Sequence, residues 1–121
     1  MRTKFFKLRI PKFYPSGVVA NPYTLKLEYK NCIIEVDYIR DLKTKKWYGA
    51  MDCWMKSHGQ GSPVSIEKRD KNFNTKQECI INYLCDAEEY LDKSDCQSES
   101  ERKIKDKLLK LVQKKLWELE R

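Results

Sequence analysis

His58 is the only histidine in the chain, so any histidine-based acid–base, nucleophilic or metal chemistry depends on this residue. Cys53 lies nearby and could pair with it as a nucleophile with its base. However, Cys53 alternates with Met51 and Met55 in a strand-like segment, which is typical of a buried structural thiol. The five cysteines also contain no C-x-x-C pair, so they offer neither a zinc knuckle nor a redox motif. We therefore predict no catalytic residues, no metal, no cofactor and no enzymatic activity.

The loop 57–63 has the sequence Ser-His-Gly-Gln-Gly-Ser-Pro and could cradle a phosphate through its backbone N–H groups. It is not a P-loop, because no G-K-[ST] motif follows it and no helix begins at its end. A flexible hairpin connection is the alternative that we favour for this loop. His58 and Gln60 remain candidate residues for contact with a nucleic acid or a protein partner.

An acidic cluster, Glu88, Glu89 and Asp92, falls near the end of a predicted helix. Acidic side chains at that end oppose the helix dipole, which hints at a role beyond helix stability. A solvated helix face is one interpretation of the cluster. In the other interpretation, the three carboxylates mimic phosphates and engage a basic groove on another protein.

The N-terminal arm carries the strongest functional signal, because the first acidic residue of the chain is Glu28. Residues 1–50 hold 11 Lys and Arg against 4 Asp and Glu, and this excess equals the net charge of +7 of the whole chain. Basic side chains bind phosphates and aromatic rings stack on bases, so we predict contact with a nucleic acid or nucleoprotein, with solubilising charge as the alternative. The candidate residues of the arm are Arg2, Lys4, Phe5, Lys7, Arg9 and Lys12, and a lysine-rich turn adds Lys43, Lys45 and Lys46.

Period-two alternation of apolar residues predicts the strands of the sheet that must position these candidates. The connecting turns are too short for parallel pairing, so we predict an antiparallel meander of three to five strands. Residues 4–10 also alternate and form either an edge strand or a disordered arm. The other predicted strands are 23–29, 32–39, one that begins at Trp47, and a short fourth strand at 64–66.

Two capping boxes predict two helices. Thr75 and Glu78 begin the first helix, which packs on the sheet, and Ser98 begins an amphipathic C-terminal helix with Glu101 as its reciprocal partner. We therefore predict an α+β fold of ββββα order, one helix packing the sheet, plus the C-terminal helix. Its parts are a basic aromatic arm or edge strand at 1–22, a sheet-and-helix core at 23–93 and the terminal helix at 94–121. The apolar stripe of residues 98–121 either docks on the core, which we favour, or forms a homodimer.

The sequence contains no obvious membrane or export signal. No apolar run approaches the length of about 20 residues that a membrane helix needs. Arg9 and Pro11 interrupt any apolar region of a signal peptide. We expect a cytoplasmic protein with no membrane partner.

The order of strands followed by a helix resembles the double-stranded-RNA-binding-like folds and the HicB-type antitoxins. Residues 47–81 contain the pieces W-Y-G, G-Q-G-S-P-V-S-I and F-N-T-K-Q-E. Together with the lysine-rich terminal helix, they are similar to small accessory proteins carried by phages, plasmids and conjugative elements of Bacteroidetes-like bacteria. Anti-CRISPR and anti-restriction inhibitors also occur in this setting.

This resemblance implies an anti-CRISPR-like inhibitor without enzymatic activity that binds a nucleic acid–protein complex. Its expected partner is a host effector nuclease or the guide RNA or DNA of that nuclease. One alternative is a nucleic-acid-binding antitoxin or transcriptional regulator of the HicB-like type, which would dimerise through the terminal helix. A small nuclease or transferase ranks third, because the chain lacks paired catalytic groups.

Overall fold

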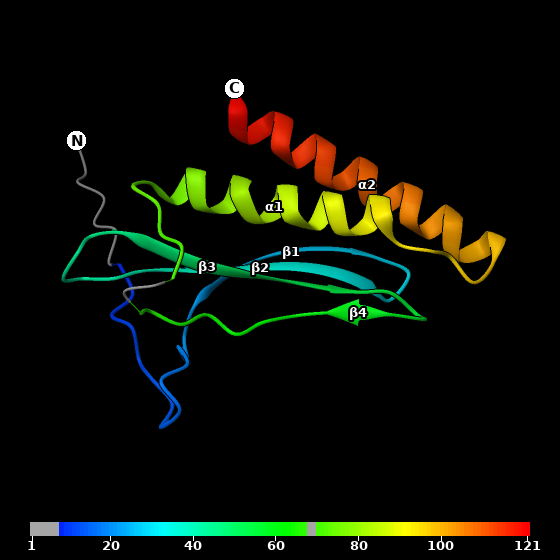
Figure 1. The fold of residues 1–121 in the computed structure, drawn as a ribbon. Helices are drawn as coiled ribbons and strands as arrows, with labels where there is room; N and C mark the ends of the chain where they lie inside the picture. The colour runs from blue at the N-terminus through cyan, green and yellow to red at the C-terminus, as the bar shows by residue number, and fades with distance from the viewer. Residues whose placement is uncertain (1–7, 68–69) are drawn as a thin grey trace, which may run out of the picture.

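The computed structural model describes residues 8–67 and 70–121, and in this part of the chain one sheet is covered on one face by two helices (Figure 1). The sheet is an antiparallel meander with the strand order β1-β2-β3-β4. The predicted α+β fold with a C-terminal helix is thus confirmed. The elements are β1 (Tyr23–Tyr29), β2 (Cys32–Arg40), β3 (Trp47–Trp54), β4 (Gly59–Gln60), α1 (Lys76–Lys93) and α2 (Glu99–Glu120).

The first hairpin forms because its turn residues tolerate left-handed dihedrals. Lys30 and Asn31 have φ values of 48° and 67°, which fit a two-residue turn whose twist matches that of the flanking strands. The turn pairs Tyr29 with Cys32 and sets the register for the rest of β1 and β2. This register sends the alternate apolar residues of both strands to the same face of the sheet.

That inner face packs against both helices and forms the main core. Leu84 and Leu108 are fully buried at its centre, one from each helix. The apolar stripe of α2 therefore docks on its own chain, as we favoured from the sequence. The buried residues of this core are Cys32, Ile34, Val36, Met51, Cys53 and Met55 from the sheet region, Ile80, Leu84, Ala87 and Leu91 from α1, and Ile104, Leu108, Val112 and Leu116 from α2.

The outer face of the sheet carries a second, smaller core at one end. It consists of Val19, Ile39, Tyr48, Ala50 and Val64. The prediction of a fourth strand at 64–66 is wrong, because this segment crosses beneath the outer face instead of extending the sheet. Its backbone forms one isolated bridge, between Ser65 and Val18, and the fourth strand of the sheet is β4.

The start of the chain was predicted to form either an edge strand or a disordered arm over residues 4–10. Residues 8–10 have no regular structure, so this part of the proposed edge strand 4–10 is not a strand. Residues 1–7 lie outside the described residues. Within the described part of the chain, neither helix combines the length and the apolar composition needed to span a membrane.

Glu101 joins the beginning of α2 to the turn between β3 and β4. Its backbone N–H donates to the N-cap hydroxyl of Ser98 over 3.1 Å. Its carboxylate accepts hydrogen bonds from the backbone N–H of Gln97 (2.8 Å) and of Ser57 (3.0 Å), and from the Ser57 hydroxyl (2.7 Å). The bonds from Gln97 and then Ser57 lower the pKa of this carboxyl. A single buried carboxylate thus holds together segments that are 44 residues apart.

Glu101→Gln is therefore expected to reduce the loss of stability in acid. Because the folded pKa lies below the ordinary value of 4.5, ionised Glu101 stabilises the fold above that pH. This contribution is lost as the pH falls through the lower folded pKa, so the melting temperature of the native chain should fall as the pH drops below the ordinary value of 4.5. The variant should melt lower than the native chain at neutral pH and change less with acidity. Glu99→Gln in the same helical turn is the control, and equal pH profiles for the two variants would contradict this role of Glu101.

Candidate nucleic-acid interface

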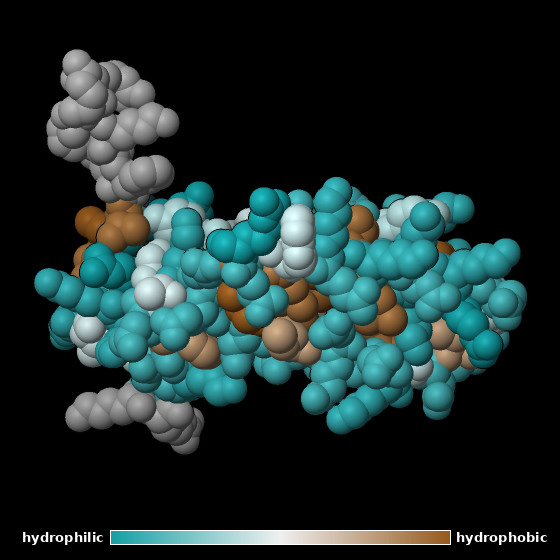
Figure 2. All heavy atoms as spheres, turned by 90° about the horizontal axis from the view of Figure 1, so that it is seen from above, coloured by the Kyte–Doolittle hydropathy of each residue, from teal (hydrophilic) through white to brown (hydrophobic). Residues whose placement is uncertain are grey.

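The exposed side of α2 carries a continuous basic stripe. Its members follow one another at intervals of four, three, four, three and four residues, which keeps them on one face of a helix. All are exposed, and they lie opposite the buried apolar residues of the same helix. In Figure 2, which views the molecule from above, the surface is largely hydrophilic. We define the basic stripe as Lys103, Lys107, Lys110, Lys114, Trp117 and Arg121.

The first half of the basic stripe borders a groove of about 490 Å³. Two hairpin turns reach this groove from the sheet, and each adds a lysine, Lys30 from the β1–β2 turn and Lys56 from the β3–β4 turn. The Lys30 amine also lies 5.7 Å from the centre of the Tyr29 ring, which lines the same groove. Asp106 is the one acid in the lining. We define the lysine groove as Lys30, Lys56, Lys103, Lys107 and Lys110.

The lysine groove concentrates positive charge that the described part of the chain leaves unpaired. None of its five lysines forms an ion pair with a described carboxylate, whereas Lys115 of the same helix pairs with Glu118. Lys103 and Lys107 are separated by one helical turn, and like charges at this spacing destabilise a helix by about 0.2–0.5 kcal/mol. A bound polyanion would relieve this repulsion.

Trp117 adds an aromatic surface to the basic stripe. Its side chain is 61% exposed, although tryptophan is usually well buried in folded domains. The Arg121 guanidinium lies 4.4 Å from the centre of the indole ring. An exposed ring beside basic side chains can stack on a nucleobase while the cations contact phosphates.

The structure assigns Arg9 a structural role that the sequence did not predict. Its guanidinium lies 4.6 Å from the centre of the Tyr23 ring and donates to the carbonyl of Pro22 over 2.8 Å. Its backbone N–H donates to the Tyr23 hydroxyl over 2.7 Å. Arg9 therefore fastens the N-terminal segment to β1 and is less available to a phosphate than we predicted. The other candidates near it, Arg2, Lys4, Phe5 and Lys7, lie outside the described residues.

The remaining predicted basic residues lie at the other end of the sheet from the lysine groove. Lys12 is exposed on the segment that leads into β1. Lys43 and Lys45 are exposed in the turn between β2 and β3, while the amine of Lys46 donates to the side chain of Asn74. Because β1 and β2 are antiparallel, the start of β1 and the end of β2 lie at the same end of the sheet. The structure thus places Lys12 and the lysine-rich turn at one end of the sheet and the lysine groove at the opposite end.

His58 and Cys53 do not form a catalytic pair. The His58 Nδ1 and the Tyr90 hydroxyl share a hydrogen bond of 2.7 Å, and the imidazole ring is half-buried beside that tyrosine. Cys53 is completely buried, and burial raises the pKa of its thiol to about 12. At neutral pH this cysteine is a neutral structural thiol, as predicted. Gln60 is exposed and lines a different cleft.

The predicted acidic cluster on α1 is partly engaged with neighbouring side chains. Glu88 accepts a hydrogen bond from the Gln113 amide of α2 over 3.3 Å, which links the two helices. Glu89 forms an exposed ion pair of 3.5 Å with Lys93, one turn along α1. Asp92 is exposed. A contact of this cluster with a protein partner stays a prediction.

A second acidic group lies on the outer face of the sheet, where Glu35, Asp37 and Asp52 bring carboxylate oxygens within 4.8 Å of one another. Burial first, and the neighbouring negative charges after it, raise the pKa of Glu35; burial is also the main cause of the raised pKa of Asp37. The fold partly satisfies this charge, because the Thr24 hydroxyl donates to Asp37 over 2.8 Å. The Ser62 N–H likewise donates to Asp52 over 3.0 Å. We predicted no metal, and these three carboxylates are close enough together to offer ligand atoms to a metal ion.

Comparison of the chain with protein-family models, curated proteins and solved structures finds no match. The basic stripe and the lysine groove are therefore described from their own geometry. The sequence does contain a signal for the stripe, because seven basic residues between positions 102 and 115 surround the single acid Asp106. When these residues are placed on a helix, the spacing of four of the lysines puts them on one face. Lys30 and Lys56 carry no comparable local signal.

Proposed function

We propose that this protein binds nucleic acid along the exposed face of α2, through the basic stripe and the lysine groove. The observation that carries the proposal is the alignment of unpaired lysines with an exposed tryptophan on one helical face. At 1.5 Å per residue, the distance from Lys103 to Arg121 is about 27 Å, which is long enough to follow several phosphates. Lysine contacts to phosphates and stacking on Trp117 carry little sequence information, so we expect a sequence-tolerant interaction.

A single-stranded segment fits this surface best. Stacking on Trp117 requires a base whose face is accessible, and bases in a duplex are already stacked on each other. The lysine groove at the other end of the stripe would then hold the sugar–phosphate chain. Single-stranded RNA or DNA is therefore the expected ligand, and catalysis is not part of the proposal.

Inhibition of a host defence nuclease, of the anti-CRISPR type, is the second candidate function. The separation of charge favours it, because the basic stripe and the carboxylates of Glu35, Asp37 and Asp52 belong to opposite layers of the molecule. Such a protein would contact both the nucleic acid and a basic protein surface of one complex. A HicB-like dimer through the apolar stripe of α2 is less well supported, because that stripe is buried within the chain.

The test is a salt titration of binding to a labelled single-stranded oligonucleotide and to the matched duplex, read by fluorescence anisotropy. With about five phosphate contacts on a single strand, log K should fall with log salt with a slope of about −3.5. Binding would then weaken on the order of 100-fold between about 50 and 200 mM salt. Binding that does not depend on salt would contradict the proposal. Recovery of a nuclease from a host lysate, with and without nuclease treatment of that lysate, tests the second candidate.

A further inference from the structure

The strand β3 has an open stretch of edge on the side away from β2. At one end of this stretch, the N–H and the C=O of Trp47 both bond to Phe73, over 2.7 and 2.9 Å. At the other end, Cys53 pairs with Gln60 of β4. Because hydrogen-bonding direction alternates along a strand, Gly49 and Met51 must point their backbone groups to the same side as these two residues.

The backbone groups of Gly49 and Met51 have no hydrogen-bond partner among the described residues on that side. Segment 61–66, which we call the crossing segment, does not pair with β3, because pairing with this edge ends after the two residues of β4. Its departure buries Val64, which is 2% exposed, beneath the outer face of the sheet. The edge is therefore open between two closed ends, and an edge of this kind is a template for an added strand.

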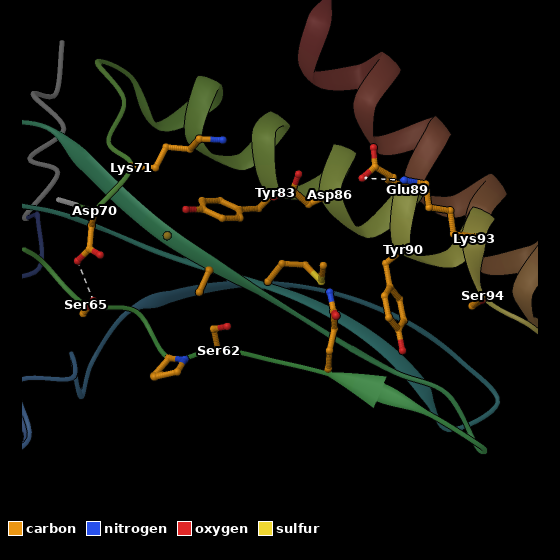
Figure 3. Close-up of a pocket in the computed structure, with 15 residues that line it drawn as sticks. Ser62, Ser65, Asp70, Lys71, Tyr83, Asp86, Glu89, Tyr90, Lys93 and Ser94 are labelled. Carbon is orange, nitrogen blue, oxygen red and sulfur yellow. Dashed lines mark hydrogen bonds and ion pairs between the residues drawn. The ribbon is translucent and has the colours of Figure 1, made fainter.

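A cleft of about 610 Å³ lies along this open edge (Figure 3). Tyr83, Asp86 and Tyr90 come from α1 on one side of the cleft, and Ser62 and Ser65 come from the crossing segment on the other (Figure 3). Gly49 and Met51 belong to the same lining. The cleft thus places space for a peptide beside the unpaired backbone groups.

We propose that an extended peptide segment of a partner protein adds to β3 in this cleft as an extra strand. The stretch from Tyr48 to Asp52 would pair with a segment of about five residues, because both strands would rise by about 3.3 Å per residue and so pair one residue to one. Asp86 is exposed on α1 at the rim and has no ion pair among the described residues. The expected partner segment therefore carries a lysine or arginine side chain toward Asp86. This inference does not depend on nucleic-acid binding by α2.

Amide hydrogen exchange of the free chain gives the first test. The amides of Tyr48 and Ala50 pair with β2 and should exchange slowly, whereas those of Gly49 and Met51 should exchange rapidly. This contrast between adjacent residues provides its own control. Slow exchange of Gly49 and Met51 in the dilute free chain would overturn the inference, because the edge would then be closed already.

The second test uses a blocked peptide, Thr-Val-Thr-Arg-Thr-Val-Thr, at millimolar concentration. Its binding should slow exchange at Gly49 and Met51, and a version methylated on alternate backbone nitrogens should not do so. Asp86→Lys should weaken binding by about fivefold, while Asp95→Lys, the same change at an exposed position outside the cleft, should not. Absence of binding, equal binding of the methylated peptide, or chemical-shift changes confined to another surface would each overturn the inference.

Discussion

Replacement of Lys103, Lys107 and Lys110 by glutamine is expected to weaken binding of a single-stranded oligonucleotide on the order of 100-fold at about 0.1 M salt. Each lysine that neutralises a phosphate contributes about 0.7 to the magnitude of the salt slope on single strands. The slope should therefore become less steep by about 2. Anisotropy titrations at several salt concentrations measure both the affinity and the slope.

The same triple variant should fold as well as the native chain. Glutamine and lysine have similar helix propensities, so the backbone of α2 gains no penalty. The substitutions also remove the repulsion between Lys103 and Lys107, which are one turn apart. Thermal unfolding followed by circular dichroism should show an unchanged or slightly higher Tm. A binding defect accompanied by a large fall in Tm would point to damage of the fold instead.

Lys12, Lys43 and Lys45 offer a matched control, because their replacement by glutamine changes the net charge equally. These three residues lie at the other end of the sheet, on the surface that the sequence favoured for nucleic acid. The control variant should bind within a few-fold of the native chain, since exposed charges more than about 10 Å apart are largely screened at this salt concentration. Loss of binding in the control alone would transfer the interface to the arm and the lysine-rich turn.

The fold was predictable where its causes are local. The alternation in β1 and β2 and the two helix caps at Thr75 and Ser98 depend on residues within a few positions of one another, and the structure confirms all of them. The fourth strand was not predictable in this way. Val64 is a residue type that is typical of strands. In the structure it is buried against Ile39 and Tyr48 from strands distant in sequence, and this packing holds the segment beneath the sheet.

The candidate site shows the same division between local and distant causes. The periodic spacing from Lys103 to Arg121 is present in the sequence, and a helical phase suffices to place these residues on one face. The lysine groove also needs Lys30, which is 73 positions before Lys103 and is brought to it only by the fold. Conversely, the charge of Arg9 was visible in the sequence, but its stacking partner Tyr23 was not. A charged residue becomes a candidate for binding only when its neighbours leave it unpaired.

Because α2 docks on the core, we expect Leu108→Ala to lower the free energy of unfolding by a large amount. The Leu108 side chain is 0% exposed and packs within the core formed by the sheet and α1. Truncation of a buried leucine removes its apolar contacts and leaves a cavity, so the free energy of unfolding should fall by about 2–5 kcal/mol. Urea unfolding monitored by circular dichroism measures this difference.

Leu111→Ala is the matched control, because Leu111 is only partly buried at the edge of the same core. Its expected cost is about 1 kcal/mol, which is typical of single substitutions. If α2 instead held two chains together, unfolding of the native protein would depend on protein concentration, and Leu108→Ala would shift the mass of the particle as well as its stability. Unfolding that is independent of concentration, with a much larger cost at Leu108 than at Leu111, would show that α2 uses its apolar side within one chain. The basic stripe would then be the side of the helix that remains free for a ligand.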